Sequence, residues 1–600
     1  MTYRSSSYSW SVPLRKRPEV SREKVETVFS DHYRIPPFQR EFSWQRENVS
    51  DLIEDLDGLV TRSESYYFLG QIVTTTQDSD ENLEQPYVVD GQQRLVTIQL
   101  LACYLYKRMS DSRFSETAPL LLQMVKTIEN RGGFRLKVFL KKGDHIFRKI
   151  LADEPLPEVG EVESATERNL IEAFSQIKDS LDGRDDEYIA EFQLGLRTRT
   201  FFSKLEIGTI GEALEVFEVM NQRGLKLSDS DLIKNFLFRN LDEEEFESFS
   251  QTWDSVAKKI FKLRPRRLAS FNSLLRSELI ARTGSVVSTE TLLQGWDEYL
   301  IGSGASSTPR EFIRELPTFA DAYCKFSDLR RVNDTPFPDG AALKYFRTTQ
   351  HFPILMAGRR LRNLDFLVRL VEERILLSLF AAEGPQNFER LVPIWAKSIN
   401  ELAIQNARAT TQEILGESSR AFSDLPMLWE RFSVGFGRLT YIRDKKRIRY
   451  VLARISGALE SKCFGESDDD FLNGRRIHIE HIEPASSSTW SRQELSDNSQ
   501  LHSIGNLTLI RRRPNSSMGD APPADKVEYY RGSWAINQML CPSENLEIPE
   551  SNRKNAILQL QEDFQASLQR WEPDVVERRG RWLMNQFAET LNLMNPPDFD

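Results

Sequence analysis

Three of the six histidines in this 600-residue chain, His478, His481 and His502, lie within a stretch of 25 residues. An even distribution would rarely place more than one of them there, so the cluster indicates a shared role. A neutral imidazole can take a proton from water. Glu480 and the side-chain carbonyl of Asn515 offer hard oxygen ligands, which suit Mg²⁺ or Mn²⁺ better than zinc. Together these residue types predict metal-assisted hydrolysis of a phosphodiester.

Two strands and a short helix are expected to position these side chains. The run "RRIHIEHI" alternates as a strand does and ends at Pro484, and "NLTLIRR" supplies a second strand. The later run "ADKVEYY" can form a short helix. This β, β, α order places His481 near the end of the first strand and Asn506 at the start of the second. An ordinary histidine on an exposed strand is the simpler interpretation, but "EHIEP", "GNLTL" and a later Asn in this order favour the chemical one.

A second stretch, "YVVDGQQRL", joins a β-like run to an amphipathic helix that starts near Leu95. Residues 91–94 then form the helix N-terminus, where free backbone N–H groups attract phosphates. Gly91 allows close approach, Arg94 can hold phosphate oxygens in a fork, and Asp90 can bind a metal or polarise water. The stretch therefore predicts a phosphate site. A purely structural turn remains the alternative, because Asp-Gly is a common turn signal between a strand and a helix.

Length and composition limit the class of protein. Six hundred residues exceed what one core usually serves, so roughly two to four domains are expected. The chain shows neither an apolar leader nor an uncharged apolar run long enough to span a bilayer, so we expect a cytoplasmic protein without a membrane partner. Four cysteines without CxxC spacing argue against a disulfide framework and a cysteine zinc site. The net charge of −10 is unusual for a nucleic-acid enzyme, but basic clusters occur at 264–267, 443–449 and 511–513.

The pattern along the chain changes from mixed to helical. Up to about residue 110, "FLGQIVTTTQ" and "PYVVDG" predict a hairpin or neighbouring strands. From about 110 to 470 the pattern is mostly helical, and "NLDFLVRLVEERILLSLF" carries an apolar stripe typical of a core helix. In "VFEVMNQRGLKLSDSDLIKN", Gly224 suits a helix end. This junction is either a capped connection between helices or a place from which Asn221 and Arg223 reach the phosphate site.

These motifs resemble the GmrSD-type family of modification-dependent restriction endonucleases, with relatives in phosphorothioate-sensing phage defence. "IPPFQREFSW", "FLGQIV" and "VVDGQQRL" look like the family's ParB/sulfiredoxin-like nucleotide-hydrolysing domain, and "VFEVMNQRGLKLSDSDLIKN" is similar to a later block of it. "IHIEHIEP", "GNLTLI" and the following Asn look like its HNH nuclease domain. The resemblance implies an α+β multidomain protein, with a ParB-like α/β domain at 1–240, a largely helical region at 241–440, and a ββα-metal (HNH) domain embedded in helices at 441–600.

The resemblance also implies roles for individual residues. The nucleotide site would consist of Gln39, Arg40, Asp90, Gly91, Gln92, Gln93 and Arg94, with Asp90 also catalytic. In the nuclease domain His481 would be the general base, Glu480 and Asn515 would bind the metal, and Asn506 would orient the base or its loop. The wider HNH class more often has Asp where Glu480 stands, and the Lys expected after the last Asn corresponds to Lys526.

The expected function is a nucleotide-dependent, metal-dependent endonuclease that restricts foreign, modified phage DNA. Its cofactors would be Mg²⁺ or Mn²⁺ and a nucleoside triphosphate whose base the sequence does not identify. Its partner would be DNA, and the chain could also form a homo-oligomer, which the sequence does not decide. A neutral His base predicts that cleavage falls below about pH 6.5. Two alternatives stay open: a nucleotide-switched DNA-binding scaffold with an inactive HNH fold, and an RNA-directed nuclease toxin.

Overall fold

The structure is a computed structural model that describes most of the chain. The described residues are 17–36, 42–61, 66–75, 85–129, 133–162, 164–221, 229–263, 270–288, 291–302, 308–381, 385–465, 470–486, 500–512, 518–546, 551–564 and 567–591. The chain forms two compact units: Met1–Lys258 with Thr289–Pro317, and Lys259–Ser288 with Thr318–Asp600. The division into three parts at residues 240 and 440 stays a prediction.

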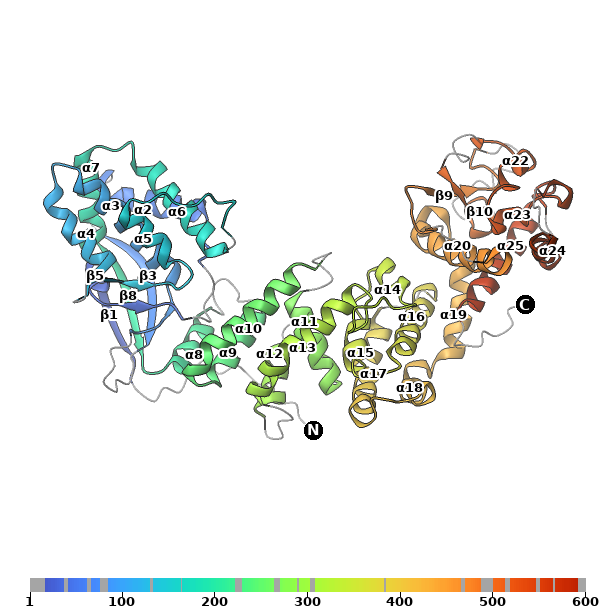
Figure 1. The fold of residues 1–600 in the computed structure, drawn as a ribbon, viewed down its shortest axis with the longest axis horizontal. Coiled ribbons are helices and arrows are strands. Elements are labelled where there is room, and N and C mark those ends of the chain that lie inside the picture. Colours follow the sequence, from blue (N-terminus) through green and yellow to red (C-terminus); the bar gives the residue numbers. More distant parts are fainter. Residues whose placement is uncertain are drawn as a thin grey trace. The chain divides into compact units, whose positions relative to one another are not determined.

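The first unit contains a four-stranded mixed sheet (Figure 1). Its order is β1 (Glu19–Lys24), β8 (Thr200–Ile207), β3 (Tyr67–Thr75) and β4 (Val88–Asp90). Strand β8 runs antiparallel to β1 and parallel to β3, and β3 runs antiparallel to β4. The prediction that the "FLGQIV" and "YVVD" segments are neighbouring strands is therefore confirmed. Two short pairs, β2 (Tyr33–Arg34) with β7 (Val138–Phe139) and β5 (Lys126–Ile128) with β6 (Phe134–Leu136), complete its strands among the described residues.

Helices pack on this sheet through one apolar core, which includes Ile72 of β3, Val88 of β4 and Phe202 of β8 (Figure 1). The core helix is α3 (Gln92–Ser110), whose residues from Leu95 to Leu105 are all buried, and it starts directly after β4. The helices around it are α1 (Val25–Val28), α2 (Arg46–Thr61), α4 (Ala118–Val125), α5 (Asp144–Ala152), α6 (Ala165–Leu181) and α7 (Asp186–Thr198). Further helices are α8 (Ile210–Asn221), α9 (Asp229–Arg239), α10 (Glu243–Phe261) and α12 (Leu292–Leu300).

The second unit begins with a helical region, as the periodicity predicts. Its helices are α11 (Phe271–Thr283), α13 (Pro309–Ser327, which starts in the first unit), α14 (Ala341–Phe346), α15 (His351–Ala357), α16 (Leu364–Phe380), α17 (Pro385–Gln405), α18 (Thr411–Ser418), α19 (Leu425–Gly437) and α20 (Tyr441–Phe464). Helix α16 carries the predicted apolar stripe, of which Leu364, Leu367, Val371 and Ile375 are buried. The core role predicted for this helix is confirmed.

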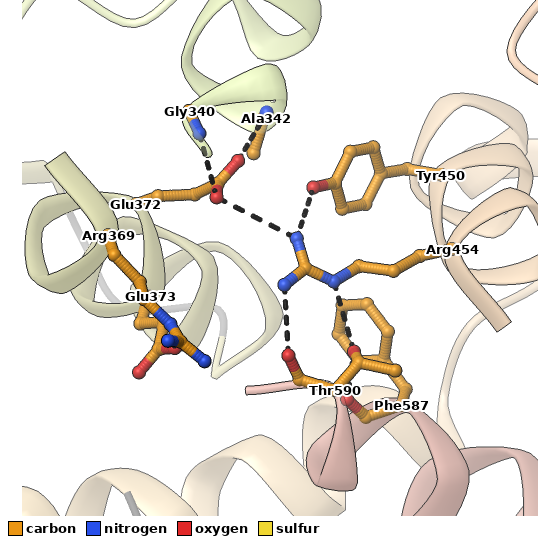
Figure 2. Close-up of polar contacts among 9 residues, drawn as sticks. All are labelled: Gly340, Ala342, Arg369, Glu372, Glu373, Tyr450, Arg454, Phe587 and Thr590. Atoms are coloured by element: carbon orange, nitrogen blue, oxygen red, sulfur yellow. Dashed lines mark hydrogen bonds and ion pairs between the residues drawn. The ribbon is translucent and has the colours of Figure 1, made fainter. Parts of the chain in front are cut away.

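A buried polar cluster ties helix α16 to the end of the chain (Figure 2). Both carboxylate oxygens of Glu372 accept backbone N–H groups, from Gly340 at 3.0 Å and Ala342 at 2.7 Å. The Arg454 guanidinium of α20 lies 3.7 Å from Glu372 and donates to both oxygens of Thr590, at 3.0 Å and 2.9 Å. Because a buried carboxylate needs such partners, the cluster fixes α16, α20 and the segment after α25 (Pro573–Glu589) relative to one another.

The C-terminal part of this unit has the predicted β, β, α order. Strands β9 (Ile477–His481) and β10 (Leu507–Arg511) pair antiparallel, with His481 opposite Leu507. The helix is short: a 3-10 turn, Pro523–Lys526, continues into α22 (Val527–Tyr530). Helices α23 (Ala535–Gln538), α24 (Ser551–Phe564) and α25 follow and share an apolar core with α19 and α20. The chain is thus mostly helical with small sheets, which agrees with an α+β multidomain class.

In the part of the chain that the structure describes, no helix has both the length and the apolar character needed to cross a lipid bilayer.

Candidate functional site

His481 is the last residue of β9 and is half-buried between two side chains from other segments. Its ring packs edge-on against the ring of Tyr441, the first residue of α20, with the centroids 4.6 Å apart. Its Nε2 lies 3.3 Å from Nδ1 of His502, at the end of a 3-10 turn, Gln500–His502. Two of the three clustered histidines therefore meet, and the second imidazole orients the ring of the first.

The environment of His481 keeps its imidazole neutral. Burial lowers the pKa of His481 to about 4, and the electrostatic interactions with His502, Lys526 and Lys445 act in the same direction. A neutral imidazole can accept a proton throughout the neutral range. If His481 is the base, its lowered pKa places the expected loss of activity at a lower pH than the value of about 6.5 expected for an ordinary histidine.

Glu480, the residue before His481, forms a buried ion pair with Lys526. The Lys526 side chain is fully buried, and its Nζ lies 2.6 Å from Glu480 Oε1 and donates to the backbone carbonyl of His481, also at 2.6 Å. Burial raises the pKa of the Glu480 carboxyl and nearby Asp520 raises it further, while Lys526 opposes both. The position thus pairs a desolvated carboxylate with a cation.

Of the two residues predicted to bind a hard metal ion, the structure describes only Glu480, so the metal site stays a prediction. Among the described residues, His, Cys, Asp and Glu side chains form no cluster of three that could hold a metal. The second predicted ligand, Asn515, lies outside those residues. Glu480 nevertheless offers a buried carboxylate that already attracts a cation, and the charge of Asp520 acts on it. Such oxygen donors suit Mg²⁺ or Mn²⁺.

Asn506 is fully buried and holds the loop that connects the two strands. Its Oδ1 accepts from Glu483 N and from Trp571 Nε1, both at 2.9 Å. Its Nδ2 donates to the carbonyls of Glu483 at 2.9 Å and Leu501 at 2.8 Å. Asn506 thus joins the residues after His481 to the turn that carries His502, and its predicted role in orienting the base or its loop stays a prediction.

Helix α25 supports the same loop from behind. Arg579 is fully buried and donates from Nη1 to the carbonyls of Gly505 at 2.8 Å and Leu507 at 2.6 Å. A Cβ at Gly505 would lie 2.0 Å from the carbonyl oxygen of Val576, so only glycine allows this approach of the loop to the helix. The sequence analysis named His502 only as part of the histidine cluster and did not single out Trp571 or Arg579. The histidine cluster was the sequence signal for His502. Trp571 and Arg579 lie too far along the chain from the motif to give such a signal.

The second predicted site lies where β4 meets α3 in the first unit. Gly91 adopts a left-handed conformation, φ 87°, and precedes the first turn of α3. Asp90 Oδ1 accepts from the Gly91 N–H at 2.7 Å, and burial raises the pKa of the Asp90 carboxyl, against the opposing charge of Arg94. The predicted strand, glycine turn and helix N-terminus are present.

The polar residues of this turn hold neighbouring backbone. Arg94 donates from Nη1 to the Leu69 carbonyl at 2.6 Å and from Nη2 to the Gln71 carbonyl at 2.7 Å. Gln93 Oε1 accepts from the backbone N–H groups of Ser43 at 2.9 Å and Trp44 at 3.4 Å. Both terminal nitrogens of Arg94 thus bond to the backbone of β3, whereas the sequence predicted that they would hold phosphate oxygens.

Other predicted residues of this site can be placed only in part. Gln92 is buried in the first turn of α3. Gln39, Arg40, Arg223 and Gly224 lie outside the described residues, as does the side chain of Asn221. The nucleotide site therefore stays a prediction, with Asp90, Gly91 and Arg94 brought together at one turn.

Comparison with protein families matches both regions. Residues 25–238 match the N-terminal domain of the GmrSD restriction endonuclease, and residues 430–586 match the C-terminal domain of GmrSD restriction endonucleases. The two matches together cover more than half of the chain; the first includes the Asp90 turn and the second includes Glu480, His481 and Asn506. No curated protein sequence matches the chain.

Proposed function

Because the chain belongs to the GmrSD family of restriction endonucleases, we propose that it restricts foreign, modified phage DNA by metal-dependent and nucleotide-dependent cleavage. In this proposal the β9–β10 pair and the following short helix form an HNH nuclease, and the sheet with α3 forms a ParB-like nucleotide-hydrolysing domain. Nucleotide hydrolysis in the ParB-like domain would regulate DNA cleavage by the HNH nuclease.

The observation that carries the nuclease proposal is the position of His481. It ends β9, follows a buried carboxylate, and has its pKa lowered to about 4. Such a base takes a proton from water while the water oxygen forms a bond to phosphorus and the bond to the 3′ oxygen breaks. His502 and Tyr441 hold the ring, and Asn506 holds the loop beneath it.

The chemistry of this reaction also needs help for the leaving oxygen. A bound Mg²⁺ or Mn²⁺, held by Glu480 and Asn515, would supply charge for that oxygen. Lys526 keeps a positive charge beside Glu480 and thereby favours the ionised carboxylate that a metal requires. The ion pair with Lys526 would accordingly keep Glu480 ionised, as its proposed role as a metal ligand requires.

For the nucleotide site we propose the turn from Asp90 to Arg94 together with Gln39 and Arg40. Helix α3 starts directly after the left-handed Gly91, and the backbone N–H groups of its first turn would attract a phosphate. Asp90 would act on the phosphate or its metal. Gln92, Gln93 and Arg94 would shape this turn, since Gln93 and Arg94 hold the surrounding backbone.

The test is cleavage of plasmid DNA and of modified phage DNA with Mg²⁺ or Mn²⁺, with and without each nucleoside triphosphate. Wild type, His481→Ala and Asp90→Ala are compared in parallel. The proposal expects cleavage by wild type, none by His481→Ala, and loss of the nucleotide effect in Asp90→Ala. Absence of cleavage of every DNA by wild type would contradict the nuclease assignment. An unchanged nucleotide effect in Asp90→Ala would contradict the regulatory one.

A further inference from the structure

A cavity of about 620 Å³ lies beside the loop that carries His502 and Asn506. Its walls come from the end of α19, the start of α20, residues 500–505 and α25. The floor is apolar, with Phe436, Ile504 and Met584, and the rim carries hydroxyl and amide groups, including Ser503 and Gln500. This mixture of an apolar floor and a polar rim is typical of a ligand site.

The charge at the rim of the cavity is mainly positive. Arg438, Arg443 and Arg581 line it, and the carboxylate among its lining residues, Glu577, lies 3.6 Å from Arg581. Arg443 donates from Nε to the Thr440 hydroxyl at 3.3 Å. Within the described residues, no carboxylate pairs with Arg438 or Arg443. Two exposed guanidinium groups therefore remain available to an anion, and their forked N–H groups match phosphate oxygens.

The cavity and the surroundings of His481 are built from the same two chain segments. Thr440 and Ser503, which both line the cavity, form a backbone bridge to each other. The next residue after Thr440 is Tyr441, whose ring contacts the His481 ring. The residue before Ser503 is His502, which lies 3.3 Å from His481. On each of the two segments, a residue that lines the cavity is therefore the direct chain neighbour of a residue that contacts His481.

We infer that this cavity binds a backbone phosphate of the nucleic-acid strand that is cut, close to the scissile bond, through Arg438 and Arg443. The inference rests on the proposed DNA cleavage and adds the place where the strand is held. A strand held there would run close to the segments that hold His481, because Thr440 and Ser503 of the cavity wall are the chain neighbours of Tyr441 and His502. Free phosphates, such as those of a nucleoside triphosphate, share this chemistry, so the experiment has to separate the two sources.

The experiment measures DNA binding by the full-length chain at several salt concentrations. All proteins carry His481→Ala, so that binding is separated from cleavage. The double variant Arg438→Gln/Arg443→Gln is compared with the parent and with the control Arg578→Gln. Arg578 also lies on the surface of α25, but it is ion-paired with Asp574 at 3.5 Å and does not line the cavity. The melting temperature of each variant checks that folding is unchanged, as expected for exposed side chains.

The expected result is weaker DNA binding by the double variant, by roughly tenfold or more at low salt, and a slope of log Kobs against log salt that is smaller by about 0.9 for each lost phosphate contact. The control should match the parent. An unchanged affinity and slope in the double variant would overturn the inference while leaving the proposed function intact. Loss of triphosphate binding with unchanged DNA binding would also overturn it, since the cavity would then serve a free nucleotide. If the parent binds no DNA, the inference and the proposed function fail together.

Discussion

The ammonium group of Lys526 lies 2.6 Å from Glu480 Oε1 in the C-terminal part of the second unit, with the Lys526 side chain completely buried. The same nitrogen donates to the carbonyl of His481. This contact links the residue proposed to bind metal to the backbone of the proposed base. The charge balance of this pair and the proposed catalytic geometry therefore depend on the same two side chains.

Lys526→Met should lower the free energy of unfolding by about 3–5 kcal/mol, because it leaves the Glu480 carboxylate buried without its cation. Burial already raises the pKa of Glu480, and the variant should raise it further, so the loss should be larger at pH 7.5 than at pH 5. Urea unfolding at both pH values measures this. The exposed Lys445→Met serves as the control. Equal stability of Lys526→Met and wild type would contradict the role of the pair.

The pH dependence of cleavage should have its acidic limb far below the ordinary histidine value. The pKa of His481 is lowered to about 4, and only the neutral ring acts as base, so activity is lost as pH falls through that value. We expect a nearly constant single-turnover rate between pH 8 and about 5.5 at saturating metal. A half-maximal rate near pH 6.5 would show that the ring is not desolvated as described.

Asn506→Ala should destabilise the C-terminal part of the second unit and slow the proposed cleavage. The substitution removes the partners of the Glu483 N–H and the Trp571 indole N–H, and each buried group left unpaired costs roughly 1–3 kcal/mol. Trp571→Phe removes one of these bonds and should cost less. Chemical denaturation and cleavage assays of both variants check this order. A larger effect of Trp571→Phe than of Asn506→Ala would contradict it.

Gly91→Ala should destabilise the first unit. The added Cβ would lie 2.5 Å from Ile72 Cγ2, and the residue would keep a φ of 87°, which costs roughly 1–3 kcal/mol. Gly183→Ala is the matched control, because a Cβ at Gly183 meets no atom within 4 Å. Differential scanning calorimetry of both variants measures the effect. Equal melting temperatures for the two would show that the turn tolerates a side chain.

Several features of the fold could be predicted because their signals are local. The alternation in "RRIHIEHI" predicted β9, and the three- and four-residue spacing of apolar residues predicted α16. Asp-Gly before an amphipathic run gave the turn at Gly91. In each case the pattern lies within about one element, so periodicity and turn preferences contain the information.

Contacts between distant segments could not be predicted in the same way. Arg94 is a plausible phosphate ligand by residue type, yet its terminal nitrogens bond the carbonyls of Leu69 and Gln71 on another strand. Trp571, which precedes α25, and Arg579, which lies in α25, support Asn506 and its loop from more than 60 positions later in the chain. A single sequence does not record which polar group meets which carbonyl across such a separation, because tertiary packing decides it.

The most direct test of the nuclease account is single-turnover cleavage of a labelled, modified DNA duplex with Mg²⁺ by wild type, His481→Ala and His478→Ala. Residues 478 and 481 point to opposite faces of β9, so the second variant controls for changes to the strand. The account predicts that His481→Ala cleaves at least roughly 100-fold more slowly with unchanged DNA affinity, while His478→Ala stays within a few fold of wild type. Cleavage by His481→Ala at the wild-type rate would contradict it.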